Sequence, residues 1–244
     1  MDLAQIVTFS SAYVALAFLP PIIWLLIYLR EDSHPEPSYL IILTFLGGIG
    51  AAFAALLAER ALINFINPDT RLGLFFGLIA LIEEYAKYLA VKLLVLKRKD
   101  FNEPIDAMIY MVSAGLGFAA IENALFLFLQ QVPSAELLIL PGNLIAGAGL
   151  SAARFIGANL LHALASAIVG YFLARSWFHP MRKHLIMAGI ILASVLHALF
   201  NYLIIVKDVF PEAMLYLTAL LGFALVAVLI DFQRLKKEAI TPFN

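Results

Sequence analysis

Long apolar stretches separated by short polar segments make up most of the chain. A bilayer core about 30 Å thick needs roughly 20 apolar residues, because a helix rises about 1.5 Å per residue. Seven stretches reach that length: 4–29, 38–58, 72–96, 104–129, 150–175, 185–206 and 211–232. The pattern predicts an all-α, polytopic membrane helix bundle of about seven transmembrane helices, built as a single integral membrane domain over residues 1–244.

Proline and glycine mark two departures from straight spans. Pro20 and Pro21 lie inside the first apolar stretch, where they predict a kink. The apolar residues between the fourth and fifth stretches are interrupted by Pro133, Pro141 and Gly142. We expect a surface loop or a short re-entrant segment at about 134–149 rather than an eighth span, since irregular backbone in a membrane must be satisfied by protein or water.

The composition agrees with a membrane protein and narrows its chemistry. Hydrophobic residues make up 63% of the chain and charged residues 14%, and the formal net charge of −1 gives no basis for nucleic-acid binding. The lipid bilayer is therefore the expected surrounding, and nucleic acid is not an expected partner. The chain has no cysteine, which excludes disulfides, a thiolate nucleophile and cysteine metal ligands.

Lysine and arginine are unequally distributed between the two ends of the predicted spans. One side carries three, Arg60, Arg71 and Lys207. The other side carries ten: Arg30, Lys97, Arg98, Lys99, Arg175, Arg182, Lys183, Arg234, Lys236 and Lys237. Because basic loops stay in the cytoplasm, the sequence predicts a multi-pass protein of the cell membrane with its N-terminus outside and its C-terminus cytoplasmic.

The third apolar stretch, 72–96, carries Glu83, Glu84 and Lys87 at its middle. Placing three charges at the centre of the membrane costs about 7–10 kcal/mol of insertion free energy, whereas the large apolar residues of this stretch contribute roughly 4–8 kcal/mol in favour of insertion. Insertion of this helix alone is therefore marginal, and its charges need polar partners on neighbouring helices. For Lys87, as for Arg154 near the start of the fifth stretch, a structural ion pair is the favoured interpretation.

Three other spans carry polar residues at a similar depth: Glu122, Asn123, His162, Ser166, His197 and Asn201. Counted from the basic ends, Glu84, His162 and His197 come out at about 18–20 Å, and Asn201 and Glu122 at about 24–27 Å. Glu122 shares a helix face with Gly115, whose small size lets another helix approach closely. Glu83 and Glu84 point about 100° apart, so at most one can point straight into a common site, and the other is expected to orient it or to be an ion-pair partner. We expect one polar cluster between four helices.

Four sequence blocks resemble the PrsW family of intramembrane proteases, which is related to the CAAX prenyl proteases and the bacteriocin-immunity membrane proteases. The blocks are EEYAK at 83–87, PIDAMIYMVSAGLGFAAIEN at 104–123, HALASAIVG at 162–170 and HALFN at 197–201. Their order and spacing are similar to the family's, and they indicate a catalytic core over about 70–205. Ala107 stands where the family usually has glycine and Phe126 where it commonly has tyrosine, and neither touches the expected chemistry.

The resemblance implies an intramembrane endopeptidase that hydrolyses a peptide bond of a membrane-anchored protein, such as a single-pass anti-sigma factor. The chain has no cysteine and no serine in a nucleophile elbow, so attack by water is expected rather than a covalent route. Glu83 or Glu84 would be the base and His162 would position the water, while His197 and Asn201 would bond the developing oxyanion. Glu122 completes the catalytic group, and the expected supporting residues are Lys87, Asn123, Ser166 and Arg154.

Two alternatives remain open. A zinc-dependent version of the same protease would use His162, His197 and Glu122 as ligands, with a free glutamate as base. The chain lacks an H-E-x-x-H spacing and these ligands would come from three helices, so metal-free glutamate chemistry with no cofactor is preferred. A proton-coupled transporter or channel would use the same groups as a relay, but the sequence shows neither the internal repeat nor the paired broken helices typical of such proteins.

Overall fold

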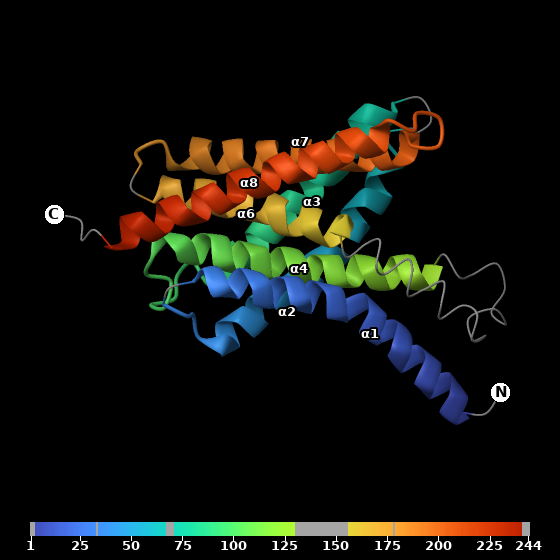
Figure 1. Cartoon of the computed structure of the whole chain (residues 1–244), viewed down its shortest axis with the longest axis horizontal. Helices are drawn as coiled ribbons and strands as arrows, with labels where there is room; N and C mark the ends of the chain where they lie inside the picture. The colour runs from blue at the N-terminus through green and yellow to red at the C-terminus, as the bar shows by residue number, and fades with distance from the viewer. Residues whose placement is uncertain (1–2, 33, 67–70, 130–155, 178, 241–244) are drawn as a thin grey trace.

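The computed structural model describes residues 3–32, 34–66, 71–129, 156–177 and 179–240, and within these ranges the chain is helical with short connections. Figure 1 shows the helices running alongside one another in one bundle. They are α1 (Leu3–Tyr28), a 3-10 helix η1 (Leu29–Glu31), α2 (Ser38–Leu62), α3 (Leu72–Leu94), α4 (Pro104–Leu129), α6 (Ala158–Ser176), α7 (Arg182–Val206) and α8 (Ala213–Ile240). The predicted all-α class is confirmed.

Six of these helices contain a segment long and apolar enough to cross a membrane, namely α1, α2, α4, α6, α7 and α8. α3 has 23 residues, which is long enough, but it carries Glu83, Glu84, Lys87 and Lys92. Its charges rather than its length set it apart, as the insertion energies predict. The polytopic membrane helix bundle is confirmed, and α3 is the helix that depends most on polar partners.

Most helix bounds agree with the apolar stretches, and the differences have simple causes. α8 continues to Ile240, beyond the predicted end at 232, because good helix formers extend it past the apolar residues. α6 begins at Ala158, whereas its predicted start at residue 150 lies outside the described residues. The predicted loop or re-entrant segment at about 134–149 and Arg154 also lie outside them.

α1 bends along its length (Figure 1). Pro20 and Pro21 lie inside this helix, and each removes a backbone N–H that the preceding turn would otherwise receive. The kink predicted from these prolines agrees with the bend.

α4 lies at the centre of the bundle, where it packs most extensively against α6, α2 and α1 (Figure 1). Of the membrane-spanning window of α4, 94% is buried inside the protein, compared with 28% for α8. α4 is therefore the core helix, and α8 presents most of its surface to lipid.

Glycines let α2 approach α4 closely. A Cβ added to Gly117 of α4 would lie 1.9 Å from the Phe45 carbonyl oxygen, and one added to Gly48 of α2 would lie 1.9 Å from that of Ala114. Backbone occupies both places, so no larger residue fits without moving a helix. This close contact sets the position of α2 beside α3 and α4.

A group of polar side chains, here called the loop cluster, joins the α1–α2 connection to the start of α4: Asp32, His34, Glu36, Glu103, Asp106 and Tyr110. Asp106 Oδ2 accepts the backbone N–H groups of Asn102 and Glu103, each at 2.8 Å, and so caps the first turn of α4. Asp32 accepts the backbone N–H groups of His34 at 3.0 Å and Glu36 at 3.2 Å. The Tyr110 hydroxyl donates to Glu36. The carboxylates of this cluster therefore organise backbone.

Candidate active site

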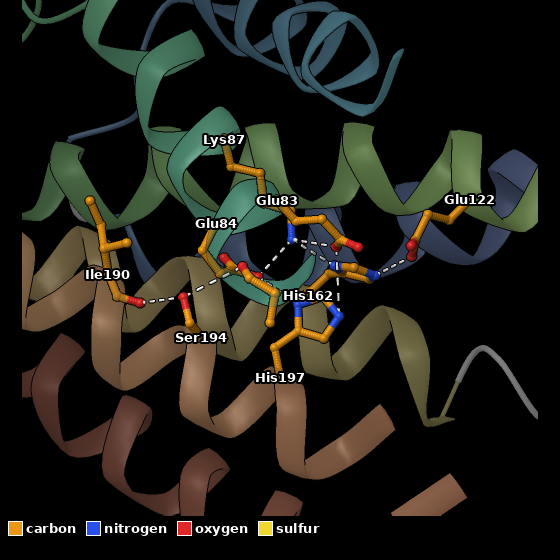
Figure 2. Close-up of polar contacts among 9 residues, drawn as sticks. Glu83, Glu84, Lys87, Glu122, His162, Ile190, Ser194 and His197 are labelled. Atoms are coloured by element: carbon orange, nitrogen blue, oxygen red, sulfur yellow. Dashed lines mark hydrogen bonds and ion pairs between the residues drawn. The ribbon is translucent and has the colours of Figure 1, made fainter. Parts of the chain in front are cut away.

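The centre of α3 carries three buried ionisable side chains (Figure 2). Lys87 follows Glu83 by four residues and Glu84 by three, so the lysine can reach both glutamates on the same side of the helix. Lys87 Nζ donates to Glu84 Oε1 at 2.8 Å and lies 3.9 Å from Glu83 Oε2. It also lies 4.3 Å from the centre of the Phe118 ring on α4, a cation–π contact. One cation thus serves two carboxylates.

Histidines from α6 and α7 complete what we call the buried cluster: Glu83, Glu84, Lys87, Glu122, His162 and His197 (Figure 2). Lys87 Nζ lies 2.8 Å from His162 Nδ1, and His197 Nδ1 lies 2.8 Å from Glu84 Oε1. The two imidazole rings are perpendicular with centres 5.1 Å apart. The structure therefore brings Glu84, His162 and His197 together at one level, as the depth count predicts.

The partners of His162 determine which of its nitrogens carries hydrogen. An ammonium can only donate, so His162 Nδ1 accepts from Lys87 and the neutral ring carries its hydrogen on Nε2. That Nε2 is bonded to Glu122 Oε2 of α4. The Glu122 side chain is 30% exposed. Glu122 therefore orients His162 from a less buried position.

Glu83 and Glu84 differ in how many donors contact their carboxylate oxygens. Glu84 Oε1 receives both Lys87 and His197. Within the described part of the chain, Glu83 Oε2 is buried without an N–H or hydroxyl donor, and its nearest cluster groups are His197 Nε2 at 3.6 Å and Lys87 Nζ at 3.9 Å. Glu84 Oε2 also lacks a donor there, but its carboxylate is already held by two charged or polar partners. Glu83 has the larger unused accepting capacity.

The expected supporting residues have different surroundings. Asn123 Nδ2 donates to the Ala17 carbonyl of α1 at 3.2 Å and to Asn159 Oδ1 of α6 at 2.9 Å, which ties three helices together. Ser166 packs against Gly115, where an added Cβ would lie 2.2 Å from its Oγ. The close helix approach predicted at Gly115 is confirmed.

Asn201 lies one turn beyond His197 on α7 and is half-buried. No hydrogen bond joins it to the buried cluster within the described residues. Ser194, on the same helix, lies close to the cluster: its Oγ donates to the Ile190 carbonyl at 2.7 Å and approaches the Ala80 carbonyl of α3 at 3.4 Å. Ser194 thus links α7 to the turn of α3 that precedes Glu83.

Sequence reasoning missed one carboxylate beside the buried cluster. Glu59, in the last turn of α2, lies close enough to Glu83 and Glu122 for their charges to interact. A sequence signal was present, since Glu59 follows the small residues Ala51, Ala52 and Ala55 on one helix face. Its position beside Arg60 at the end of an apolar stretch instead suggested a membrane boundary.

Three residues are arranged so that they could hold a metal ion. Glu83, His162 and His197 each offer a ligand atom, and these atoms lie within 4.8 Å of one another. His197 bonds Glu84 through Nδ1, which leaves Nε2 facing Glu83 Oε2, and metal-binding histidines are typically held in this way by a carboxylate on the other nitrogen. These residues fit a divalent ion that accepts nitrogen and oxygen ligands, such as zinc, provided that His162 gives up one of its present partners, Lys87 at Nδ1 or Glu122 at Nε2. The grouped carboxylate is Glu83, whereas the sequence interpretation named Glu122.

Comparison with known proteins identifies a family that this chain resembles over most of its length. Residues 36–230, most of the chain, match the model of the PrsW family intramembrane metalloproteases. Protease PrsW of Geobacillus kaustophilus (strain HTA426) is 28% identical over 74% of this chain and 74% of its own. Protease PrsW of Oceanobacillus iheyensis is 28% identical over 77% of this chain and 81% of its own, and Protease PrsW of Bacillus subtilis (strain 168) is 23% identical over 72% and 75%. No solved structure gives a significant match.

A polytopic helix bundle with a buried cluster of carboxylates and histidines, together with the family match, indicates a membrane-embedded enzyme. The chain belongs to the PrsW family and is an intramembrane protease. The resemblance predicted from four short blocks is confirmed, and the transporter alternative is not needed to explain the buried charges.

Proposed function

We propose that this protease cleaves a single-pass membrane protein, of the anti-sigma-factor kind, by attack of a water molecule that Glu83 activates. The observation that carries the proposal is the buried Glu83 Oε2, which lacks an N–H or hydroxyl donor in the described residues and faces His197 Nε2 at 3.6 Å. A base needs a free oxygen within reach of the water it deprotonates. Glu84 is less suited, because Lys87 and His197 both bond its Oε1.

The remaining residues of the buried cluster supply the rest of the reaction. Glu83 takes a proton from water as the water oxygen bonds the carbonyl carbon, and the carbonyl electrons move onto oxygen. His197, held between Glu84 and Glu83, donates from Nε2 to that oxyanion when its ring carries both protons, and Asn201 is the second proposed donor. When the carbon–nitrogen bond breaks, Glu83 returns its proton to the leaving amine. His162, held by Glu122 and Lys87, positions the water.

A metal-dependent form of the same reaction is the second candidate. It is favoured by the grouping of Glu83, His162 and His197 and by the description of the matched family as metalloproteases. A divalent ion held there would polarise the scissile carbonyl and make its bound water more acidic. Glu83 would then serve as a ligand, and neutral His197 would present the Nε2 lone pair rather than a proton. The protonation of His197 separates the two schemes.

The proposed activity is tested by comparing membrane-protein fragments from cells that produce the wild-type protein with fragments from cells that produce Glu83→Gln. We expect cleavage of a single-pass membrane protein that is present only with the wild type. The proposal is wrong if the two cell types show the same fragments, or if all lost cleavages map to proteins without a membrane anchor.

The choice between the two schemes needs purified protein. Metal content by mass spectrometry and cleavage rates with and without a chelator decide it. Full activity after thorough chelation, with no metal detected, supports the glutamate scheme and excludes the metal. Stoichiometric metal that is lost in His197→Ala together with activity excludes Glu83 as base and supports the metal scheme.

We further propose that the N-terminus faces outward and the C-terminus the cytoplasm, on the strength of the ten basic residues at one end of the bundle. Because the chain has no cysteine, single cysteines can be introduced at Lys99 and Val209, both exposed between helices. In intact cells an impermeant reagent should label Val209→Cys and not Lys99→Cys. The reverse pattern would overturn this orientation.

A further inference from the structure

The lipid-facing surface of α3 and α7 contains a groove of about 180 Å³, here called the α3–α7 groove. It is lined by small and apolar residues and one serine: Gly77, Leu81, Ile191, Ser194, Val195 and Ala198. Ile191 and Val195 are exposed, so the groove is open from the side of the bundle. It is smaller than the roughly 300 Å³ of a small-molecule site, and it therefore suits side chains of a helix that lies along it.

The α3–α7 groove adjoins the buried cluster. On α3, Gly77, Leu81 and Glu84 are spaced by four and three residues, which places them on one helix face. On α7, His197 follows Ser194 by three residues, and both side chains point toward α3 (Figure 2). His197 Nδ1 lies 2.8 Å from Glu84 Oε1. The helix faces that line the groove therefore continue directly into the buried cluster.

Glycine packing indicates that the occupant of the groove is a helix. A Cβ added to Gly115, Gly170 or Gly189 would lie 2.2, 2.6 and 2.6 Å from atoms of a neighbouring helix, so these glycines already serve contacts within the bundle. A Cβ added to Gly77, or to Gly73 one turn earlier, would meet no described atom within 4 Å. Small residues four positions apart are typical of a surface against which another transmembrane helix packs. The open pair on α3 thus favours a helix from another molecule over a lipid chain.

Two larger grooves are less suited to bring a helix to the buried cluster. Grooves of about 250 and 530 Å³ lie between α6, α7 and α8, and no described residue of α3 lines either of them. A helix docked there would lie against α8, which carries no residue of the buried cluster. The α3–α7 groove is smaller, but it borders the helix that carries both central glutamates.

We propose that the α3–α7 groove docks the transmembrane helix of the protein substrate, with side chains of that helix seated against Gly77 and between Ile191 and Val195. The inference rests on the proposed function, because it takes the buried cluster to be the active site. Since the groove leads along α3 to Glu84, a helix docked there holds the adjoining peptide bond beside the cluster. The groove contributes to substrate binding and not to the chemical step.

Filling the groove tests the proposal. Gly77→Leu places a side chain in the groove, and the fold should be kept because an added Cβ meets no described atom within 4 Å and leucine favours helix. The probe is the single-pass membrane protein whose fragments appear only in cells that produce the protease. With this probe, KM should rise about tenfold in Gly77→Leu while kcat stays near wild type, because the lost interaction lies outside the chemical step.

Gly222→Leu is the matched control. Gly222 is also open to an added Cβ, but it lines the 530 Å³ groove, so both kinetic constants should stay near wild type. The docking site is wrong if Gly77→Leu leaves KM unchanged, if Gly222→Leu raises it equally, or if Gly77→Leu lowers kcat alone. Thermal unfolding of both purified variants shows whether they keep their fold.

Photocrosslinking tests the same site without kinetics, and it decides the matter if Gly77→Leu does not fold. The photoreactive residue p-benzoylphenylalanine replaces Ile191 in the groove or, as a control, the exposed Phe223 of α8. The full chain also carries Glu83→Gln so that the tagged probe is not consumed. The probe should crosslink at position 191 and not at 223. Equal crosslinking at both positions, or crosslinks at 191 only to lipid or to a second copy of this chain, would overturn the docking site.

Failure of the proposed function gives a different result. If Glu83→Gln cleaved the probe as fast as wild type, Glu83 would be neither base nor ligand, whereas a crosslink at Ile191 would still place the substrate in the groove. Cleavage that depends on Glu83, without a crosslink at Ile191 and without a change in Gly77→Leu, would leave the proposed function standing and remove the docking site.

Discussion

The loop cluster and the buried cluster are both rich in carboxylates, but they are satisfied in different ways. In the loop cluster, Asp32 and Asp106 each accept two backbone N–H groups. In the buried cluster, the described contacts of Glu83, Glu84 and Glu122 all come from side chains on other turns or other helices. The first cluster shapes the backbone, whereas the second brings reactive side chains together.

The helix itself explains this difference. Residues in the middle of α3 already use their N–H groups in the helix, so no backbone donor is left for Glu83 or Glu84. Residues before the first turn of α4 have free N–H groups, and Asp106 takes them. A carboxylate at mid-helix must therefore find side-chain partners, and it can keep an oxygen such as Glu83 Oε2 available for chemistry.

The largest expected effect is on the cleavage rate, which substitutions in the buried cluster should lower and those in the loop cluster should not. Glu83→Gln should lower the cleavage rate more than about a hundredfold, which corresponds to roughly 2.7 kcal/mol of lost transition-state stabilisation. His162→Ala and His197→Ala should be similarly severe, whereas Asp106→Asn, which keeps an accepting oxygen for the two N–H groups, should stay near wild type. Cleavage rates of purified variants test this, and a loss in Asp106→Asn equal to that in Glu83→Gln would remove the distinction.

Glu122→Gln should have an intermediate effect. The glutamine oxygen can still accept from His162 Nε2, but the charge that holds the ring is lost, so we expect about a tenfold lower kcat, or roughly 1.4 kcal/mol. Metal analysis of the same variant adds information. If Glu122→Gln lost both bound metal and activity as completely as His197→Ala, Glu122 would be a ligand and its assignment as the group that orients His162 would be wrong.

The apolar stretches that predict the membrane spans also predict much of the buried cluster. Apolar length identifies the helices, and counting residues from the basic ends places Glu84, His162 and His197 at one depth. The count cannot distinguish Glu83 from Glu84, because the rotation of α3 about its axis is set by packing against α2, α4 and α7. For the same reason it grouped Glu122 with the histidines as a metal ligand, whereas the structure groups Glu83. Glu59 was missed because a charge at the end of an apolar stretch looks like a solvated boundary.

The role of Asp106 in the loop cluster can be tested by measuring stability. Asp106→Ala removes the acceptor for the N–H groups of Asn102 and Glu103, so the free energy of unfolding should fall by about 1 kcal/mol. The activity of the protein that remains folded should be close to normal. Thermal unfolding in detergent and cleavage rate per folded molecule check the two parts, and an unchanged unfolding temperature would show that Asp106 does not cap α4 in solution.

The smallest expected effect is a pH dependence of stability. Burial raises the pKa of Glu36 above its ordinary value of 4.5, against the opposing effect of the Tyr110 hydroxyl. The folded state therefore holds a proton that the unfolded chain has released, and this contribution to stability is complete below about 4.5 and is lost as the pH rises through the raised pKa. Glu36→Gln stays uncharged, so its unfolding temperature should fall less over that window. Parallel profiles for the two proteins would contradict the raised pKa.

The order in which the chain is made gives the buried contacts a further consequence. Lys87 meets His162, which is 75 positions later, and Glu84 meets His197, which is 113 positions later. At about 5–20 residues per second, a ribosome needs roughly 6–23 s to make the second of these intervals. Until His162 has been made, the two glutamates of α3 have Lys87 but neither histidine, and His197 follows only at the end of the longer interval. If the buried cluster is the active site, as we propose, a nascent chain cannot cleave neighbouring membrane proteins until His197 has been synthesised.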